Sequence, residues 1–257
     1  MAVARLHLEA DLRERARVAL DADRARQLVQ VLRLKPGDEV RAFNARDGEW
    51  EATLVEAGRK GAALSIGARR RAPAPPSVDV HLLFAPVKRA RTDAIVEKAT
   101  ELGVTVIRPV MTARTNAERV RLDRLALIAR EAAEQCERLD LPELRPPERL
   151  DRLLDGWAKT DLGRRLLFLD EAAGGDGSPW REASAGAPPV REALTAAGGG
   201  PWAVLIGPEG GFAPEERALL RAQAFVTPAS LGPRILRADT AAIAALTLWQ
   251  TVLGDWL

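Results

Sequence analysis

A stiff, proline-rich segment divides this chain into two parts with different patterns. It has the sequence Arg-Arg-Arg-Ala-Pro-Ala-Pro-Pro-Ser and runs from Arg69 to Ser77. Because proline fixes φ and lacks an N–H donor, the segment is predicted to be extended, with the linker proper over residues 71–77. We therefore expect one domain over residues 1–70 and a second domain over residues 78–257.

Short apolar segments precede the linker, and the turn sequences Pro36-Gly37-Asp38, Asp47-Gly48 and Lys60-Gly61 separate them. One helix is predicted among them, over Asp23–Val31. The predicted strands are Val18–Leu20, Glu39–Phe43, Trp50–Glu56 and Ala62–Ile66. Short strands at this spacing favour a small β-barrel.

Strand-like and helix-like segments alternate after the linker. The predicted strands are Val78–Phe84, Val104–Val110, Arg165–Asp170 and Trp202–Gly207. The predicted helices are Arg91–Leu102, Leu122–Arg138, Pro214–Gln223 and Ala238–Leu253, with a short one near Val190–Leu194 inside a predicted surface loop over Ala172–Pro201. This alternation favours an α/β domain with a mostly parallel sheet covered on both faces.

Composition narrows the classes of function. The single cysteine, Cys136, excludes an internal disulfide, and it is predicted to pack in the core; His7 and His81 form no cluster with metal-ligand spacing, so we expect no metal site. There is no apolar run of transmembrane length and no signal-peptide pattern at Met1–Glu9, so we expect a cytoplasmic protein. Residues 1–77 hold 15 Lys and Arg against 11 Asp and Glu, a net charge of +4. That charge suits contact with phosphates, although a G+C-rich genome would supply the same arginines.

Two Gly-Pro loops are predicted at the carboxyl edge of the sheet, where open α/β sheets bind ligands. The first is LIGPEGGF at Leu205–Phe212, and the second is LGPRILRADT at Leu231–Thr240. Glycine lacks a Cβ atom, so the backbone of such a loop can come close to a ligand. Neither loop has the Gly-Lys-Ser/Thr or GxGxxG pattern of the common nucleotide sites. Alone, Gly-Pro-Glu-Gly-Gly can be an ordinary tight turn, but two such loops favour a binding site.

These loops resemble the two closing motifs of the SPOUT-class 16S rRNA (uridine-N3) methyltransferases, the RsmE family. Further matches are Lys88, Val96–Pro109, Arg114 and Glu131–Arg138, and Val31–Val40 is similar to the family's PUA-like RNA-binding barrel. The resemblance implies a C-terminal SPOUT fold with a deep trefoil knot after a small PUA-like β-barrel. It also implies that the protein binds S-adenosyl-L-methionine and methylates N3 of a uridine in 16S rRNA, within the small ribosomal subunit.

The resemblance also implies site residues. The cofactor contacts would be Leu169, Leu205, Ile206, Gly207, Pro208, Glu209, Gly210, Leu231, Gly232, Pro233, Ile235 and Leu236. The candidate RNA contacts are Arg5, Arg33 and Lys35 in the barrel, and Lys88, Arg114 and Arg138 in the family motifs. Three positions depart from the family pattern: Gln27 replaces a frequent His, Thr115 a usual Ser, and Asp239 a Glu that is one methylene longer.

Methylation at N3 sets chemical demands on the site. N3 of neutral uracil carries a proton that must leave before or during attack. Negative charge then spreads to O2 and O4, which Arg234 or Arg237 could stabilise unless they form salt bridges across a dimer interface. Glu209 could contact the cofactor or the base, or accept bonds within its turn. Asp239 could accept the proton, although capping the final helix is the more usual role there.

Two other functions fit parts of the sequence. A pure RNA-binding module would bind no cofactor, and the two Gly-Pro loops argue against it. A tRNA ribose methyltransferase of the same fold would need asparagine and serine motifs that are missing here. A homodimer is expected because the final helix has an apolar face, although the same face can pack on its own sheet. That face consists of Ile243, Leu246, Trp249, Gln250 and Leu253.

Overall fold

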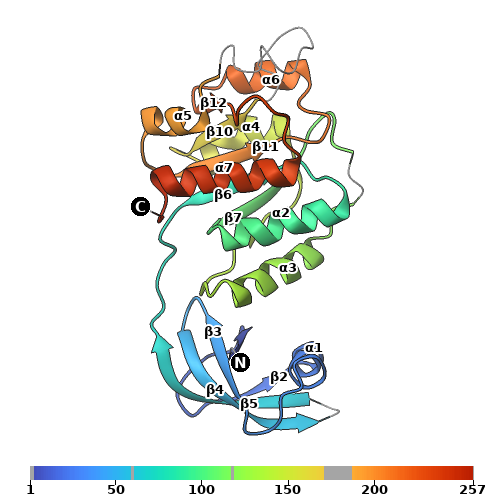
Figure 1. Cartoon of the computed structure of the whole chain (residues 1–257), viewed down its shortest axis with the longest axis vertical. Coiled ribbons are helices and arrows are strands. Elements are labelled where there is room, and N and C mark those ends of the chain that lie inside the picture. Colours follow the sequence, from blue (N-terminus) through green and yellow to red (C-terminus); the bar gives the residue numbers. More distant parts are fainter. Residues whose placement is uncertain (1–2, 59–60, 117–118, 171–186, 257) are drawn as a thin grey trace. The chain divides into compact units, whose positions relative to one another are not determined.

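The computed structural model describes residues 3–58, 61–116, 119–170 and 187–256 (Figure 1). Contacts divide the chain into two units. Unit 1 consists of Met1–Pro75 and Ala133–Leu141, and unit 2 consists of Pro76–Ala132 and Pro142–Leu257. The sequence analysis placed residues 133–141 in the second domain, whereas the structure groups them with unit 1. Residues 172–186 of the predicted loop over Ala172–Pro201 lie outside the described residues, and the short helix predicted near Val190–Leu194 is confirmed over Val190–Ala197.

Unit 1 contains a five-stranded sheet with the order β1-β3-β4-β5-β2. The strands are β1 (Ala4–His7), β2 (Arg17–Leu20), β3 (Glu39–Asn44), β4 (Gly48–Gly58) and β5 (Gly61–Arg71). The four predicted strands are confirmed, and β1 is a further edge strand, parallel to β3. Within the described ranges no pairing joins β1 to β2, which are the two end strands of this small sheet.

Strand β5 is longer than the sequence indicated. Arg69 pairs with Trp50, and Arg71 pairs with Glu49. The three arginines that were assigned to the start of the linker therefore continue the strand, because β4 offers them backbone partners. Residues 72–77 contain no helix or strand, so the extended segment begins after Arg71.

The predicted helix of unit 1 is confirmed in two parts, α1 (Ala22–Arg26) and the π-helical turn η1 (Gln27–Val31). The carboxylate of Asp21 caps α1 by accepting a hydrogen bond from the Arg24 N–H at 2.8 Å. The Arg24 guanidinium forms a buried ion pair with Glu134 at 2.6 Å. Segment Ala133–Leu141 is thus bound into unit 1 by a charged contact as well as by packing.

Unit 2 contains a seven-stranded sheet with the order β12-β10-β11-β6-β7-β8, and β9 also pairs with β7. All of these pairings are parallel, as the alternating pattern predicted. The strands are β6 (Val80–Phe84), β7 (Val106–Met111), β8 (Glu143–Leu144), β9 (Glu148–Arg149), β10 (Arg165–Leu169), β11 (Trp202–Ile206) and β12 (Val226–Ala229). Strands β8, β9 and β12 were not predicted; β8 and β9 have two residues each, and β12 is a short edge strand that contains a proline.

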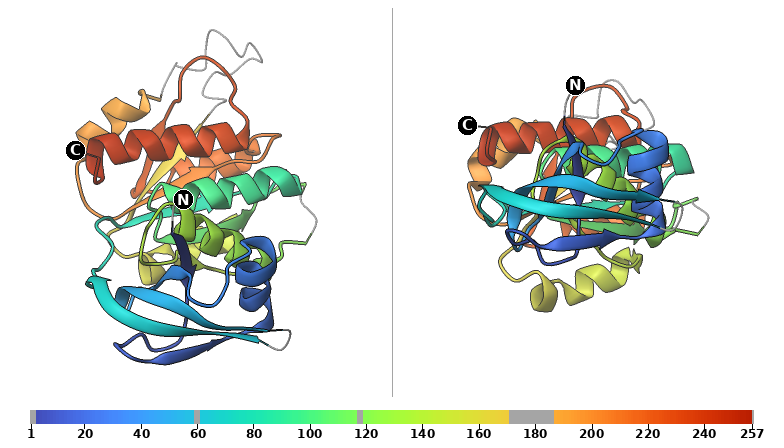
Figure 2. Two further views of the ribbon diagram at one scale, coloured as in Figure 1. Left: turned by 60° about the horizontal axis from the view of Figure 1, so that its bottom comes forward. Right: turned by 90° about the horizontal axis from the view of Figure 1, so that it is seen from below.

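Helices cover both faces of this sheet. They are α2 (Arg89–Glu101), α3 (Leu122–Gln135), α4 (Leu150–Thr160), α5 (Val190–Ala197), α6 (Pro214–Arg221) and α7 (Ala238–Leu253). Helices α2 and α7 pack side by side on one face (Figures 1 and 2). Consecutive residues of β6 point to opposite faces of the sheet. Leu82 packs with residues of α2, α5 and α7 on one face, and Leu83 packs with residues of α4 and α6 on the other.

The fold class is therefore the one expected, an α/β unit with a parallel sheet and a small N-terminal β unit. The deep knot remains a prediction. No helix in the described parts of the chain is both long enough and apolar enough to cross a membrane.

Candidate functional site

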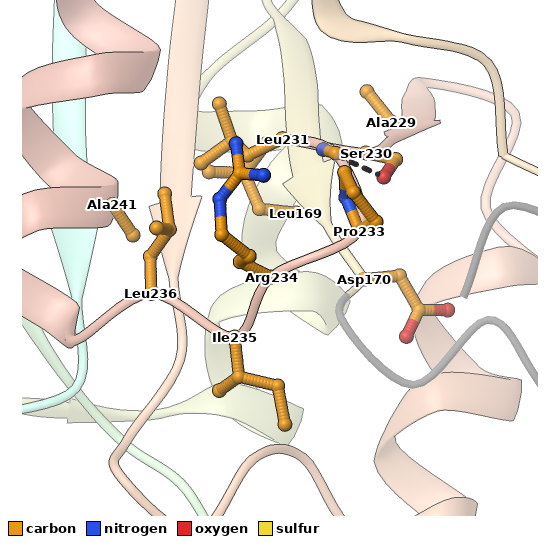
Figure 3. A pocket seen from close by; sticks show the side chains of 11 residues that line it. Leu169, Asp170, Ala229, Ser230, Leu231, Pro233, Arg234, Ile235, Leu236 and Ala241 are labelled. Carbon is orange, nitrogen blue, oxygen red and sulfur yellow. Dashed lines mark hydrogen bonds between the residues drawn. The ribbon is translucent and has the colours of Figure 1, made fainter. Parts of the chain in front are cut away.

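Two adjoining hollows, which share Leu169, Ile235, Leu236 and Ala241, form one pocket region at the carboxyl edge of the unit 2 sheet, beyond β10, β11 and β12; Figure 3 shows the first of them. We call it the edge pocket. Its walls come from the two Gly-Pro loops, the end of β10 and the first turn of α7. The lining residues are Leu169, Asp170, Ile206, Gly207, Pro208, Glu209, Ala229, Ser230, Leu231, Gly232, Pro233, Arg234, Ile235, Leu236, Ala238 and Ala241.

Most of the predicted cofactor contacts meet in this pocket. Of the twelve residues, all line it except Leu205 and Gly210. Leu205 is fully buried in the core on the α4 and α6 face, because neighbouring residues of β11 point to opposite faces. We therefore no longer propose Leu205 as a cofactor contact. Gly210 lies next to Arg114, beside the pocket wall.

At two positions in the Gly-Pro loops the structure explains why the residue is a glycine. A Cβ atom on Gly207 would lie 2.6 Å from the ring of Phe212, which packs edge-to-face against Phe168. Gly232 has φ +99°, a conformation that side chains disfavour, and its N–H donates to the Ser230 hydroxyl at 3.1 Å (Figure 3). Both positions keep the loop backbone close to the pocket.

Asp170 is a pocket residue that the sequence analysis did not select. It directly follows β10 and is 2% exposed. Its carboxylate forms ion pairs with Arg217 at 3.0 Å and Arg221 at 2.7 Å, both from α6. The two arginines compensate for burying the charge, so Asp170 joins α6 to the pocket wall. Its position at the end of a predicted strand was the signal that could have identified it.

Arg234 and Arg237, the predicted anion-stabilising residues, are both exposed. Arg234 lines the edge pocket, where its side chain points away from that of Ile235 (Figure 3). Arg237 is the residue that precedes α7. Within the described residues, neither guanidinium forms an ion pair, so both remain available to a ligand or to a partner subunit.

Glu209 lines the pocket, and its carboxylate already has a partner within the protein. Its carboxylate forms an ion pair with Arg91, in the first turn of α2. Arg91 and Glu209 are 118 residues apart in the sequence. A sequence pattern therefore offered no means of finding this partner.

Asp239 lies in the first turn of α7, and no side chain caps that helix. The capping role considered for Asp239 is therefore not observed. Its Oδ1 atom is buried and has no hydrogen-bond partner within the described chain. Oδ1 of Asp161, at the opposite edge of the sheet, also lacks a partner, so the unpartnered oxygen alone does not mark a ligand site. Asp239 is a candidate because it follows Ala238, which lines the pocket.

Two of the candidate RNA contacts are occupied within unit 1. The guanidinium of Arg5 is 7% exposed, and it donates to Glu49, to the Ala133 carbonyl at 2.9 Å and to the Arg138 carbonyl at 3.2 Å. We therefore no longer propose Arg5 as a phosphate contact. Arg138 is 12% exposed and forms an ion pair with Asp140 at 2.5 Å.

The other candidate RNA contacts are exposed. In unit 1 these are Arg33, which has a positive φ of 58°, and Lys35. In unit 2 they are Lys88, which precedes α2, and Arg114, whose Nη1 donates to the Gly210 carbonyl at 2.9 Å. Cys136 is exposed, so the prediction that it packs in the core was wrong.

Comparisons with known proteins agree on one family. Models of the RNA methyltransferase domain and the RNA methyltransferase PUA domain match residues 74–250 and 20–67. The ribosomal RNA small subunit methyltransferase E of Rickettsia conorii is 30% identical over 94% of this chain and 93% of its own. The protein of the same name from Synechocystis is 31% identical over 93% of this chain and 74% of its own.

Solved structures lead to the same family. A ribosomal RNA small subunit methyltransferase E from Neisseria gonorrhoeae, bound to S-adenosyl methionine, has a TM-score of 0.81 and 26% identity over 100% of both chains. A putative methyltransferase from Legionella pneumophila with bound cofactor SAM has a TM-score of 0.80 and 27% identity over 98% of both chains. The chain therefore belongs to the RNA methyltransferase family, among the ribosomal RNA small subunit methyltransferase E proteins.

Proposed function

We propose that this protein transfers a methyl group from S-adenosyl-L-methionine to N3 of a uridine in 16S rRNA. The main support is the edge pocket, which has apolar walls and is lined by Arg234, an exposed arginine without an ion pair among the described residues. Arg237 and Asp239 do not line it, but each is next in the chain to a residue that does, Leu236 and Ala238. The curated relatives carry the name of a small-subunit rRNA methyltransferase, and two solved relatives hold the same cofactor.

The pocket residues fit this cofactor. Leu169, Ile206, Leu231 and Leu236 supply apolar side chains that suit an adenine ring. Gly207 and Gly232 allow the backbone to approach the ligand, as described above. When bound, S-adenosyl-L-methionine supplies an electrophilic methyl group on a sulfonium. The protein's task is to align N3 of the base behind that methyl group.

The charged residues at the rim fit the remaining chemistry. Asp239 accepts the N3 proton through its unpartnered oxygen. Arg234 and Arg237 donate hydrogen bonds to O2 and O4 as negative charge develops there. Glu209 is held by Arg91, so it borders the cofactor and does not act as the proton acceptor.

Assembly is part of the proposal: a cytoplasmic homodimer that acts on the small ribosomal subunit. Much of the predicted apolar face of α7 packs in its own core, since Leu246 and Trp249 are 1% and 2% exposed. Ile243, at 40% exposed, and Ile235, at 61% exposed, remain for a second copy. A monomer in light scattering at micromolar concentration would contradict the dimer.

Mass-spectrometric mapping of 16S rRNA tests the reaction. Deletion of this protein's gene should remove one N3-methyluridine, and the wild-type protein should restore it. D239N should not restore it because an amide cannot take up the proton, whereas D155N, at an exposed position of α4, should. If N3-methyluridine persists in the deletion strain, or if a methylated ribose is lost instead, the proposal is wrong.

A further inference from the structure

A carboxylate on α6 joins two loops that lie far apart in the sequence. Oε1 of Glu216 accepts a hydrogen bond from the Ala113 N–H at 2.7 Å, and Oε2 accepts one from the Ala213 N–H at 3.0 Å. Ala113 lies in the loop that follows β7. Ala213 directly follows the first Gly-Pro loop, Leu205–Phe212, which we call the Gly-rich loop. Both oxygens therefore bind backbone groups, and they fix the spacing between the two loops.

A second contact joins the same two loops. Nη1 of Arg114 donates to the Gly210 carbonyl at 2.9 Å. The loop after β7 is itself a closed turn, because the Thr115 hydroxyl accepts a hydrogen bond from the Thr112 N–H at 2.9 Å. This turn presents the Ala113 N–H and the Arg114 side chain in defined directions. The Gly-rich loop is thus held at Gly210 and again at Ala213.

We infer that Glu216 and Arg114 are positioning residues for methyl transfer, which hold the Gly-rich loop in the conformation that forms the edge pocket. Gly207, Pro208 and Glu209 line the pocket and directly precede the first of these contacts. A loop released from both contacts would populate other conformations, and cofactor affinity falls with the population of the competent one. The inference deepens the proposed function and rests on it.

A purely structural role for Glu216 makes a different prediction. Glu216 occupies the third position of α6, and its bond to the Ala213 N–H is half of a capping box. A cap alone would contribute to the stability of the helix and leave the cofactor affinity of the folded protein unchanged. The bond to Ala113, 103 residues away, has no part in capping. Cofactor affinity and thermal stability therefore separate the two roles.

The test compares E216Q with E215Q. Glu215 is the neighbouring acid in the same helical turn and is exposed, so E215Q removes the same charge without touching either loop. S-adenosyl-L-methionine affinity is measured by calorimetry without RNA, together with the melting temperature. E216Q keeps one acceptor and places an amide N–H against the other backbone donor, so its affinity should fall about tenfold or more. E215Q should bind like wild type.

R114A provides the second variant, because Arg114 is exposed and its removal should not unfold the protein. Its cofactor affinity should also fall, and the double variant E216Q/R114A should lose less than the product of the two single losses, since both contacts hold one loop. Wild-type affinity in both single variants would overturn the inference; if E216Q does not fold, R114A alone decides. A wild-type protein that binds the cofactor but leaves uridine N3 unmethylated would refute the proposed function, and the positioning roles would still stand or fall on the binding data.

Discussion

Charged side chains gather at both edges of the parallel sheet of unit 2, and the two edges use them differently. At the amino edge, Asp161 precedes β10 and has a fully buried side chain. It lies 2.7 Å from Arg108 and 3.6 Å from His81. Burial alone would raise the pKa of Asp161, but the neighbouring His81 imidazole and a hydrogen bond from Arg108 hold that pKa below its ordinary value.

At the carboxyl edge, Arg234 and Arg237 are exposed without an ion pair in the described chain. The two carboxylates that line the pocket are paired, Asp170 with Arg217 and Arg221, and Glu209 with Arg91. The arginines are what differ: Arg108 and Arg164 at the amino edge are ion-paired within the fold, whereas Arg234 and Arg237 at the carboxyl edge remain for ligands. A binding site of this kind gives up stability that internal pairing would have supplied.

The largest expected effect is on the amino edge. D161A leaves the buried Arg108 without its closest partner, and breaking a buried ion pair costs about 3–5 kcal/mol of unfolding free energy. Denaturant unfolding measures the loss. D155A, at an exposed position of α4, should change the free energy by less than about 0.5 kcal/mol. Equal effects of the two changes would show that the buried cluster has no special role in stability.

At the carboxyl edge the expected effect is on rate. R234A or R237A should lower the single-turnover rate by roughly 10²–10³-fold, as the loss of one donor to a developing anion does elsewhere. Unfolding free energy and cofactor affinity should stay near wild type. Lysine should rescue poorly, because an ammonium cannot donate two aligned hydrogen bonds.

The exposed Arg191 of α5 provides the matched control, and R191A should turn over like wild type. If R234A and R237A both reach the wild-type rate at saturating RNA, neither arginine stabilises the anion. They would then be interface or positioning residues, and the contrast between the two edges would be lost.

The smallest expected effect is a pH dependence from His81. Burial lowers the pKa of His81 below its ordinary 6.5, although Asp161 and Asp79 favour the charged form and Arg164 opposes it. His81 therefore binds a proton more readily in the unfolded chain than in the folded protein. The contribution of neutral His81 to the free energy of unfolding is complete above pH 6.5 and falls as the pH drops below 6.5. The loss is at most about 1.4 kcal/mol per pH unit. Urea unfolding should show a shallower pH dependence for H81Q; an unchanged slope would contradict this.

Local pattern predicted most of the elements of both units. Helix α7 begins and ends where the sequence indicated, because its apolar residues recur at helical spacing between clear boundaries. The missed strands β1, β8, β9 and β12 have only two to four residues, which is too short for a period to appear. Helix α4 was also missed, although its buried residues Leu150, Leu153, Leu154 and Trp157 recur at helical spacing. The error at Leu205 was avoidable, since side chains alternate along a strand and its neighbour Ile206 already faced the pocket.

Contacts within the site were less predictable than its loops. The motifs located the two Gly-Pro loops, but not the partners that hold them. Arg91 with Glu209 and Ala113 with Glu216 are joined across more than 100 residues, and each pair depends on how the sheet orders its strands. Arg5 was mistaken for a surface cation because its charge is visible in the sequence and its buried acceptors are not.

The attachment of Ala133–Leu141 to unit 1 has a consequence for the order of events during synthesis. Arg24 is 4% exposed and lies in the first 75 residues, but its carboxylate partner Glu134 is made much later. A nascent chain that has emerged only as far as Pro75 therefore contains Arg24 but not Glu134, the carboxylate that pairs with it in the folded protein. We expect the N-terminal unit to reach its final stability only after the ribosome has translated beyond residue 141, when roughly half of the protein is complete.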